Sequence, residues 1–399
     1  MFKQGVPSVT ELVWTGVHDD IEGVGAPTAF GLRRLPALRR ALDRAEFDLV
    51  VGHPPAAVPW QPGRVTALVR RFKRRAPAMF VRSLGVRLLL RPTRTPVAIL
   101  DLGDLPIIRP HNFALLDRAR IYFKRELPAD WSKVFAGSAD RGSTTPQPAS
   151  PRLAGWCAEL SPISLAVSPA RAADIASATT PSPEKIVDVF FAGRVASSPS
   201  RAAGLPELRA LARDGVRIDL PTERLDRRSS TAGAPARGSP GLRKATDGIS
   251  FRHYEAGLCE SVPLMNRPSI VRHAPLRAGE HALYYELLPG DLARTARAAL
   301  EDRAGLGRMA TAARDHVLRY HTLERLCQHV VRSCLTGDRH ARGRVPQAAV
   351  APAPRRSRVS RDTRLLFVTA WPLDTLGESR RSCGASRARS SGWPASRCP

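Results

Sequence analysis

Residues 251–266 contain the clearest candidate for chemistry, a carboxylate in the middle of a short helix. Apolar side chains recur at helical spacing around Glu255, and residues 262–266 form an apolar strand after a turn of small residues. A carboxylate fixed in this way can accept charge-assisted hydrogen bonds from hydroxyl groups, worth about 1.5–3 kcal/mol each. From this pattern alone, Glu255 is a candidate ligand residue, with His253 beside it. The alternatives are a solvated helix acid and a histidine that packs or faces solvent.

A second candidate site follows the strongly apolar strand 186–192, which is ended by Gly193 and Arg194. Glycine allows close backbone approach, and arginine offers a planar fork of N–H donors that fits phosphate oxygens. Backbone N–H groups at helix starts add about 0.3–1 kcal/mol each for an anion. We predict that both residues bind phosphate; because arginine is so frequent here, a chance arginine is the alternative for Arg194.

A third group of polar residues follows the buried strand 97–101. Asp101 ends this strand, and Asp104 and His111 come next, at the place where clefts form in α/β proteins. A histidine there could act as a general base if it is poised near neutral pH. We predict His111 and Asp104 as catalytic candidates. The alternative is a loop histidine with aspartates that cap the loop.

The segment around Glu255 resembles the donor site of GT-B glycosyltransferases, in which a Glu precedes Ala, a small-residue turn and Val-Pro. Residues 255–263 read Glu-Ala-Gly-Leu-Cys-Glu-Ser-Val-Pro, and the similarity continues through 276–285 and 290–292 to His316 and His321. The chain is most similar to the bacterial spore-protein-like (CgeB-like) glycosyltransferases with a group 1 C-terminal domain.

This resemblance implies two Rossmann-like α/β domains that face a cleft. It implies transfer of a sugar from a nucleotide-sugar donor to a hydroxyl of an unknown glycan, lipid or protein acceptor. Glu255 would accept hydrogen bonds from the ribose, and Arg272 and Glu280 would lie near the same cleft. Positioned donors can stabilise the leaving nucleoside diphosphate without a metal, so we predict neither a metal nor another cofactor.

The segment 227–250 departs from the pattern of the family. A strand and a glycine-containing turn should precede residue 251, yet this segment has almost no apolar periodicity, and Asp247 has neighbours unlike those of the family. A long structureless loop inside a compact domain is unusual. We hypothesise a reading-frame slip there and a second one over 378–399. A degenerate, inactive homologue is therefore one alternative function.

The chain is strongly basic, with a formal net charge of +26 and a pI of about 11.3. Such a charge usually indicates nucleic acid or an anionic membrane as a partner. Only six of the 62 basic residues are lysine, however, and the excess of Arg, Ala, Gly and Pro is typical of a GC-rich coding sequence. The basic stretches 227–250 and 338–399 lack the interleaved aromatics of a single-strand binding surface. We predict no nucleic-acid partner; a basic nucleic-acid-binding protein is the second alternative.

Strands and helices alternate along the chain, which indicates an α/β protein with parallel sheets. Expected strands are 48–52, 97–101, 120–124, 162–167, 186–192 and 262–266, and expected helices are 31–45, 64–75, 291–301, 303–320 and 322–335. The basic residues 70–75, with 79–90 after them, could make peripheral contact with an anionic membrane. A solvated helix face followed by an ordinary strand is the alternative.

These elements divide the chain into four parts. We predict an acceptor-side α/β domain at 1–150, a linker with a returning segment at 151–184, a nucleotide-sugar-binding domain at 185–335 with the irregular insert 227–250, and a disordered basic tail at 336–399. Residues 364–370 in the tail look like the first strand of another α/β domain that is never completed.

No run of eighteen apolar residues exists, and the start lacks a basic region followed by an apolar stretch. We therefore expect a cytoplasmic protein. The six cysteines form no C-x-x-C pair and have no zinc spacing, so we expect buried or incidental thiols.

Overall fold

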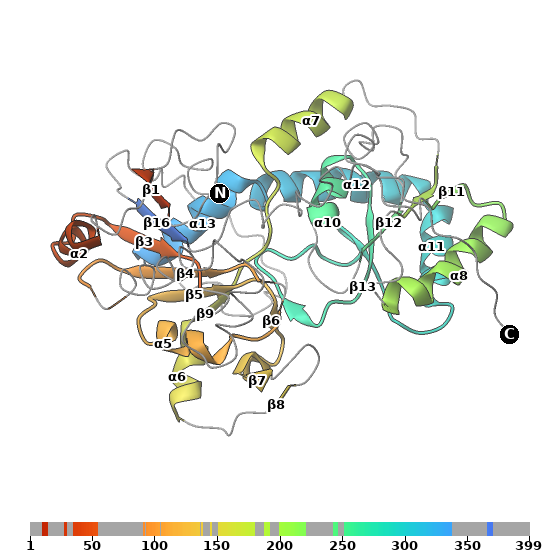
Figure 1. Cartoon of the computed structure of the whole chain (residues 1–399). Helices are drawn as coiled ribbons and strands as arrows, with labels where there is room; N and C mark the ends of the chain where they lie inside the picture. The colour runs from red at the N-terminus through yellow and green to blue at the C-terminus, as the bar shows by residue number, and fades with distance from the viewer. Residues whose placement is uncertain are drawn as a thin grey trace, which may run out of the picture.

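The described part of the chain forms an α/β structure with two separate sheets of parallel strands (Figure 1), as the alternation of strands and helices predicted. The computed structural model describes residues 10–14, 28–29, 35–54, 91, 93–103, 105–135, 137–138, 144–145, 151–179, 187–191, 199–220, 242–245, 251–336 and 365–369. Outside these residues lie the predicted segments 64–75, 79–90 and 378–399, and Asp104, Gly193, Arg194 and Asp247.

The first sheet has seven strands in the order β2-β1-β16-β3-β4-β5-β9. In chain order these are β1 (Thr10–Trp14), β2 (Thr28–Ala29), β3 (Leu49–Gly52), β4 (Val97–Asp101), β5 (Ile121–Lys124), β9 (Leu160–Pro162) and β16 (Leu365–Thr369). Their pairings are all parallel. Every residue of β3, β4 and β5 is buried, because helices cover both faces of a parallel sheet.

Alternate residues of the central strands pack into two different cores. One core joins Val50, Ile99 and Tyr122 to α2 (Leu35–Asp43), α5 (Phe113–Leu116), α6 (Pro151–Glu159) and the 3-10 helix Trp131–Phe135. The other core joins Val51, Leu100 and Phe123 to α13 (Leu323–Thr336). This alternation follows from the two-residue period of a strand. A short ribbon, β7 (Gly137–Ser138) with β8 (Thr144–Thr145), and the 3-10 helix Pro110–Asn112 also belong to this half.

Strand β16 corrects the prediction for the end of the chain. We expected residues 364–370 to start an uncompleted domain inside a disordered tail. Residues 365–369 instead lie in the first sheet, between β1 and β3 and parallel to both. An apolar segment that inserts between two strands satisfies its own backbone hydrogen bonds and leaves neither neighbour as an open edge.

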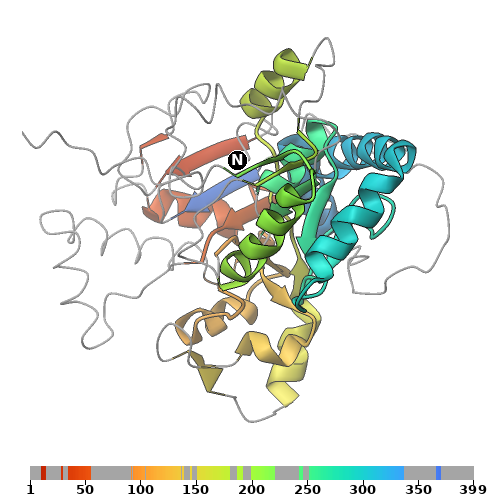
Figure 2. The ribbon, with the colours of Figure 1, turned by 90° about the vertical axis from the view of Figure 1, so that its right-hand side faces the viewer.

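The second sheet has five strands in the order β11-β10-β12-β13-β15. They are β10 (Val189–Phe190), β11 (Ile218–Asp219), β12 (Leu242–Ala245), β13 (Pro263–Asn266) and β15 (Leu283–Tyr285). Its core includes α8 (Pro199–Arg213), α11 (Asp291–Glu301) and α12 (Arg303–Tyr320). Figure 2 looks onto this end of the molecule, with α8 and α11 in the foreground. The predicted bounds of α11 and α12 are confirmed; Asp302 caps α12 by accepting from the Gly305 N–H at 2.7 Å.

Strand β12 corrects the prediction for the insert 227–250, in which we expected no strand before residue 251. Residues 242–245 pair with β10 on one side and β13 on the other, in the middle of the second sheet. Their sequence, Leu-Arg-Lys-Ala, has no apolar strand pattern, so the position between two parallel neighbours, and not local preference, gives these residues their conformation. The rest of the insert lies outside the described residues.

Two further helices cover the second sheet where it approaches the first. Helix α10 (Phe251–Leu258) packs on α12, and α7 (Pro169–Thr179) packs on α10. They share a small core with Leu165, Val167 and Val317. In the views of Figures 1 and 2, α7 stands out from the body of the molecule on top of α10.

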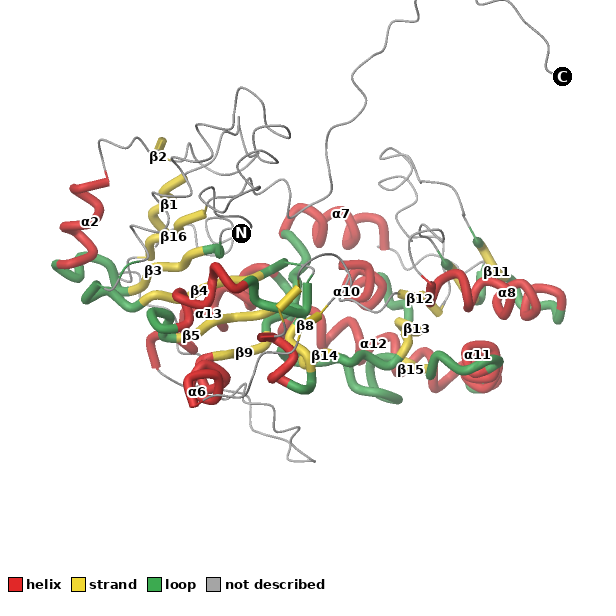
Figure 3. Tube along the Cα trace, turned by 60° about the horizontal axis from the view of Figure 1, so that its bottom comes forward, coloured by secondary structure: helices red, strands yellow, loops and turns green. Residues whose placement is uncertain are grey.

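Among the described residues, several contacts join the two halves, which we call the first and second lobes after their sheets. Strand β6 (Leu127–Pro128) of the first lobe pairs antiparallel with β14 (Ile270–Val271) of the second. Val167 forms a bridge with Thr322. Helix α13 follows α12 but packs on the first sheet (Figure 3). The sequence prediction places residues 322–335 in the second domain. The structure corrects this, because α13 packs on the first lobe.

No helix in the described residues combines the length and the apolar character that a membrane crossing needs.

Candidate functional site

The carboxyl ends of strands from both sheets meet at the ribbon of β6 and β14. Strand β5 ends at Lys124, and β6 begins at Leu127; β13 ends at Asn266, and β14 begins at Ile270. Because β6 pairs with β14, these two carboxyl edges converge at the junction of the lobes. Ligands of open α/β sheets bind beyond the carboxyl ends of the strands, so the junction is where a site is expected.

On the first lobe, a buried cluster of charged and polar groups surrounds Asp101. The Lys124 ammonium lies 3.2 Å from Asp101 Oδ2 and is only 1% exposed. The Tyr122 hydroxyl donates to the same oxygen at 3.0 Å, and the Gly103 N–H donates to Oδ1 at 3.1 Å. Burial raises the pKa of Tyr122 well above its usual value, and the charge of Asp101 adds to this effect. Each charge of this cluster therefore has a partner.

His53 directly follows β3, and the charge of Asp101 acts on its ring. Its Nδ1 is 3.0 Å from the Pro54 carbonyl oxygen. A carbonyl only accepts, so Nδ1 carries the proton and Nε2 carries the lone pair. Burial lowers the pKa of His53, while the charge of Asp101 opposes that shift. The side chain is thus a neutral base at neutral pH. His53 was not among the predicted site residues. The signal that could have found it is that His53 follows the buried strand β3, just as Asp101 ends the buried strand β4.

At the junction itself, three buried charged residues flank the ribbon. Arg125 Nε donates to Glu126 Oε1 at 3.0 Å. Burial raises the pKa of Glu126, and the charges of Arg125 and Arg272 oppose this. The pairing of Val271 with Leu127 brings Arg272 next to Glu126 along the ribbon. Two guanidinium groups and one carboxylate leave this site with an excess positive charge.

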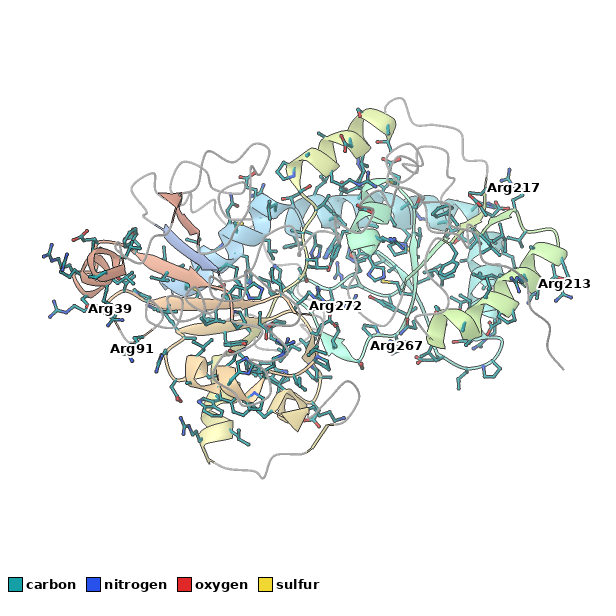
Figure 4. All side chains as sticks on the ribbon, in the orientation of Figure 1. Arg39, Arg91, Arg213, Arg217, Arg267 and Arg272 are labelled. Atoms are coloured by element: carbon teal, nitrogen blue, oxygen red, sulfur yellow. The ribbon has the colours of Figure 1, made fainter. Side chains whose placement is uncertain are left out.

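Arg272 is the exceptional member of the group. It is 8% exposed, and its Nε–H has no hydrogen-bond partner among the described residues. No ion pair of Arg272 occurs within that part of the chain either. Figure 4 shows it between the two lobes, whereas Arg39, Arg91, Arg213 and Arg217 lie at the periphery. A buried charge without a partner is strongly unfavourable, so this position suits a bound anion.

Glu255 lies on α10, where a close helix contact holds it. A Cβ on Gly257 would lie 3.0 Å from Val317 Cγ2 and 3.3 Å from the Ala313 carbonyl oxygen of α12, so only glycine permits this approach. Arg171 of α7 donates from Nε to Glu255 Oε1 at 2.9 Å. The Glu255 side chain is 18% exposed. The contact of Arg171 was not predicted, because no pattern in residues 169–179 indicates a partner on α10.

The other predicted residues lie in different surroundings. His253 is buried on α10, consistent with a packing role. Glu280 forms an ion pair with Arg277 and lies 3.3 Å from His281 Nε2. His111 is half-buried in the 3-10 helix that follows β4. The structure thus brings Arg272 to the junction, while the cluster at Asp101 is built from His53, Tyr122 and Lys124. Among the described residues, no group of three or more His, Cys, Asp or Glu side chains could hold a metal ion.

No family model matches this chain, and no curated protein matches its sequence. Solved structures that are similar in shape at low identity include the following three. HepE from Anabaena in complex with UDP-glucose is 12% identical, covers 82% of this chain and 99% of its own, and has a TM-score of 0.40.

The other two are named as a sucrose-phosphate synthase and a glycosyltransferase. Sucrose-phosphate synthase from Thermosynechococcus elongatus is 11% identical, with 81% of this chain and 98% of that chain covered and a TM-score of 0.39. A glycosyltransferase from Rickettsia africae is 10% identical, with 72% and 97% covered and a TM-score of 0.36. Identities and TM-scores this low do not establish a shared activity, so the functional argument comes from the site.

Proposed function

We propose that the protein is a nucleotide-sugar-dependent glycosyltransferase of the GT-B type, with the donor held by the second lobe and the acceptor approaching from the first. The observation that carries this proposal is Arg272, a buried guanidinium at the junction of the lobes with no ion-pair partner in the described residues. A nucleotide-sugar donor brings a diphosphate to such a position. Transfer of the sugar would take place between the predicted acceptor-side domain at 1–150 and the predicted donor domain at 185–335, whose last helix, α13, packs on the first sheet.

Arg272 would act on the leaving group. When the acceptor oxygen bonds to the sugar carbon, the bond from that carbon to the diphosphate oxygen breaks, and negative charge grows on the diphosphate. A guanidinium forms bidentate hydrogen bonds to phosphate oxygens. The low dielectric of a buried site strengthens this interaction. Arg125 and Glu126 then set the local charge, and Gly193 and Arg194 remain predicted phosphate contacts.

Glu255 would hold the ribose. Arg171 occupies Glu255 Oε1 and so orients the carboxylate, which leaves Oε2 to accept from a ribose hydroxyl. The short helix and its close contact with α12 at Gly257 fix the position of this oxygen. His253 and Glu280 remain predicted members of the donor site, in supporting positions.

His53 is the group on the first lobe best prepared to accept a proton from the acceptor hydroxyl. Its Nε2 carries a lone pair at neutral pH, and the nearby Asp101 carboxylate would stabilise the imidazolium that forms. The proton would pass from the acceptor oxygen to His53 Nε2 as that oxygen bonds to the sugar. His111 and Asp104 remain predicted catalytic candidates on the same lobe.

Nucleotide binding tests this proposal. Purified full-length protein is heated with UDP, ADP, GDP or inorganic pyrophosphate, and its melting temperature is recorded. A ligand at a hundred times its Kd stabilises the folded state by about 2.7 kcal/mol, and we expect this response from at least one nucleoside diphosphate. The Glu255→Ala variant should lose most of this rise in melting temperature. If no nucleoside diphosphate raises the melting temperature, the degenerate-homologue alternative is favoured. Tight, steeply salt-dependent DNA binding in its place would favour the nucleic-acid alternative.

A further inference from the structure

Five of the ten histidines of the chain form a continuous row of rings, which we call the histidine row. His329 stacks on His273 with ring centroids 3.7 Å apart, and His273 is 6.5 Å from His321. His321 is 5.4 Å from His316, and His316 is 4.2 Å from His281. Helix α13, helix α12 with the residue after it, and the loop 272–281 all contribute rings to the row.

The row runs through the junction of the lobes. At one end His329 lies 5.9 Å from the ring of Phe123 on β5. In its middle, His321 stacks on Tyr254 of α10 at 4.0 Å. The Ser164 hydroxyl, from the segment that crosses between the lobes, donates to the His273 carbonyl oxygen at 2.8 Å. The row therefore contacts β5 of the first sheet, helix α10 of the second lobe and the segment that crosses between the lobes.

Hydrogen bonds fix the protonation of three rings. His281 Nδ1 accepts from the Arg277 N–H at 3.1 Å, so that nitrogen carries no proton and the ring is neutral. His316 Nε2 and His321 Nε2 lie 2.9 and 2.8 Å from the Ala274 carbonyl oxygen. Because a carbonyl only accepts, both nitrogens carry protons. His321 Nδ1 is buried without a partner among the described residues, so a second proton there would have no acceptor.

The charges that face the row do not favour imidazolium ions. Arg272 and Arg277 act on it from the loop, Arg319 from α12, and Arg332 from α13. The carboxylate that faces it is Glu280, 3.3 Å from His281 Nε2. Burial, reinforced by these cations and by neighbouring rings, lowers the pKa of His321 to about 3 and the pKa values of His281 and His329 to about 4. Burial also lowers the pKa values of His273 and His316.

The residue that the row holds is strained. Ala274 has a φ of 43°, in the left-handed region that a side chain disfavours. Its carbonyl oxygen accepts from both His316 and His321. The N–H donors of His316 and His321 thus hold the loop 272–281 in a conformation that is unfavourable for the backbone at Ala274.

We propose that the histidine row is an acid-sensitive latch, which holds the loop 272–281 in place while its rings are neutral and releases it when they take up protons. Stacked and contacting rings repel once they are charged, and the strain at Ala274 then favours opening. Because Arg272 begins this loop, acid would also displace the guanidinium from the junction. The release itself does not depend on the proposed activity; only its effect on donor binding does.

The direction with pH follows from proton linkage. When the loop is open, an exposed histidine has a pKa near 6.5. In the closed row the pKa values are lower. At a pH between the two sets of pKa values, the open form therefore binds more protons than the closed form. The closed form is therefore fully favoured above about pH 6.5 and loses stability as the pH falls toward the folded values. Each proton taken up on opening changes the equilibrium about tenfold per pH unit.

Amide hydrogen exchange on the full-length protein without ligand tests the latch. Protection of a peptide that covers 272–281 is measured at several pH values between 7.5 and 5.5 and corrected for the intrinsic exchange rate. We expect protection of this peptide to fall at least about tenfold per pH unit below 6.5, while a peptide from α11 changes far less. A loop whose corrected protection is independent of pH, or falls in parallel with α11, overturns the proposal.

A double variant identifies the rings responsible. His316→Gln with His321→Gln keeps a side-chain N–H that can donate to Ala274 but cannot take up a proton. We expect at least half of the pH dependence of the loop to disappear in this variant. His111→Gln, a half-buried histidine outside the row, is the matched control, and in this variant the loop 272–281 should keep the pH dependence of exchange that the parent protein shows. If the double variant retains the full pH dependence, the proposal is wrong. Should that variant fail to fold, His329→Gln at the end of the row is measured against the same criterion.

Discussion

The two lobes treat buried charge in opposite ways at the junction. On the first lobe, Lys124, Asp101 and Tyr122 are almost completely buried, and each polar group has a partner within hydrogen-bonding distance. On the second lobe, Arg272 is buried to a similar extent, but its Nε–H has no partner in the part of the chain that is described. Mutual attraction and hydrogen bonds offset part of the cost of burying the charges of a paired cluster. Arg272 lies next to Glu126 but has no hydrogen bond or ion pair among the described residues, and this difference favours the proposal that the second lobe binds an anion.

The comparison predicts opposite effects of removing a cation on either side. Lys124→Met should produce the largest loss of stability, because it leaves Asp101 buried without its counterion. Breaking a buried pair by removing one partner costs about 3–5 kcal/mol. Urea unfolding followed by circular dichroism measures this. Lys133→Met is the matched control, since Lys133 is exposed and lies 3.9 Å from Asp130; it should change stability by under about 0.5 kcal/mol. Equal losses in the two variants would contradict the buried pairing.

Arg272→Met should have the opposite sign. The substitution removes an unpaired buried charge and keeps an apolar side chain of similar length, so the unliganded protein should gain about 1–3 kcal/mol. The same urea titration measures it. Arg267→Met is the control, because Arg267 is exposed and paired with Glu286 at 2.5 Å, and no such gain is expected. If Arg272→Met is instead less stable than the parent protein, Arg272 has a partner that stabilises the fold, and the contrast between the lobes fails.

Variants of Glu255 and Arg171 can separate the proposed ligand role of Glu255 from its ion pair with Arg171. Glu255→Gln should weaken nucleoside diphosphate binding about tenfold, because the loss of one charge-assisted hydrogen bond removes about 1.5 kcal/mol. Arg171→Gln keeps the carboxylate and should change the Kd by less than about threefold, as expected for a partly exposed pair. Isothermal titration calorimetry gives both values. Equal effects in the two variants would assign Glu255 a structural role only.

The smallest effect is expected inside the first lobe. The Trp156 indole N–H donates to Asp117 Oδ1 at 2.7 Å, and Trp156 also packs near Phe113 and Phe135. Trp156→Phe keeps the ring contacts and removes the donor, which should cost about 1 kcal/mol in the urea titration. Nucleotide binding should remain unchanged, because α6 lies away from the junction. A change in binding larger than the change in stability would link this helix to the site.

Local patterns predicted the elements whose ends carry their own signals. Helix 303–320 begins where Asp302 caps it, and strand 97–101 is a buried apolar run. The features that were missed depend on distant neighbours. Residues 365–369 form a strand as expected, but their place in the first sheet between β1 and β3 was not predicted. Strand 242–245 was not predicted and takes its conformation between β10 and β13. Helix 323–336 was predicted, yet its return to the first sheet required tertiary information.

The site shows the same division. Glu255 could be proposed from sequence because its helix and turn are contiguous in the chain, and its ligand role stays a prediction. The roles of His53 and Arg171 arise from contacts with Asp101 and Glu255, far away along the chain, and no local signal marks such contacts. The unpaired state of Arg272 is likewise a property of the assembled junction: the side chain lies next to Glu126, but Glu126 is already engaged by Arg125.

Our central proposal is that Arg272, which is buried and has no ion pair among the described residues, binds the diphosphate of a donor. Calorimetric titration of the parent protein and of Arg272→Met with the nucleoside diphosphate that stabilises the parent most strongly tests it directly. We expect saturable one-site binding by the parent and binding at least about tenfold weaker by the variant, although the variant is the more stable protein without ligand. Equal affinity in both proteins would show that Arg272 does not contact the ligand and would contradict the account.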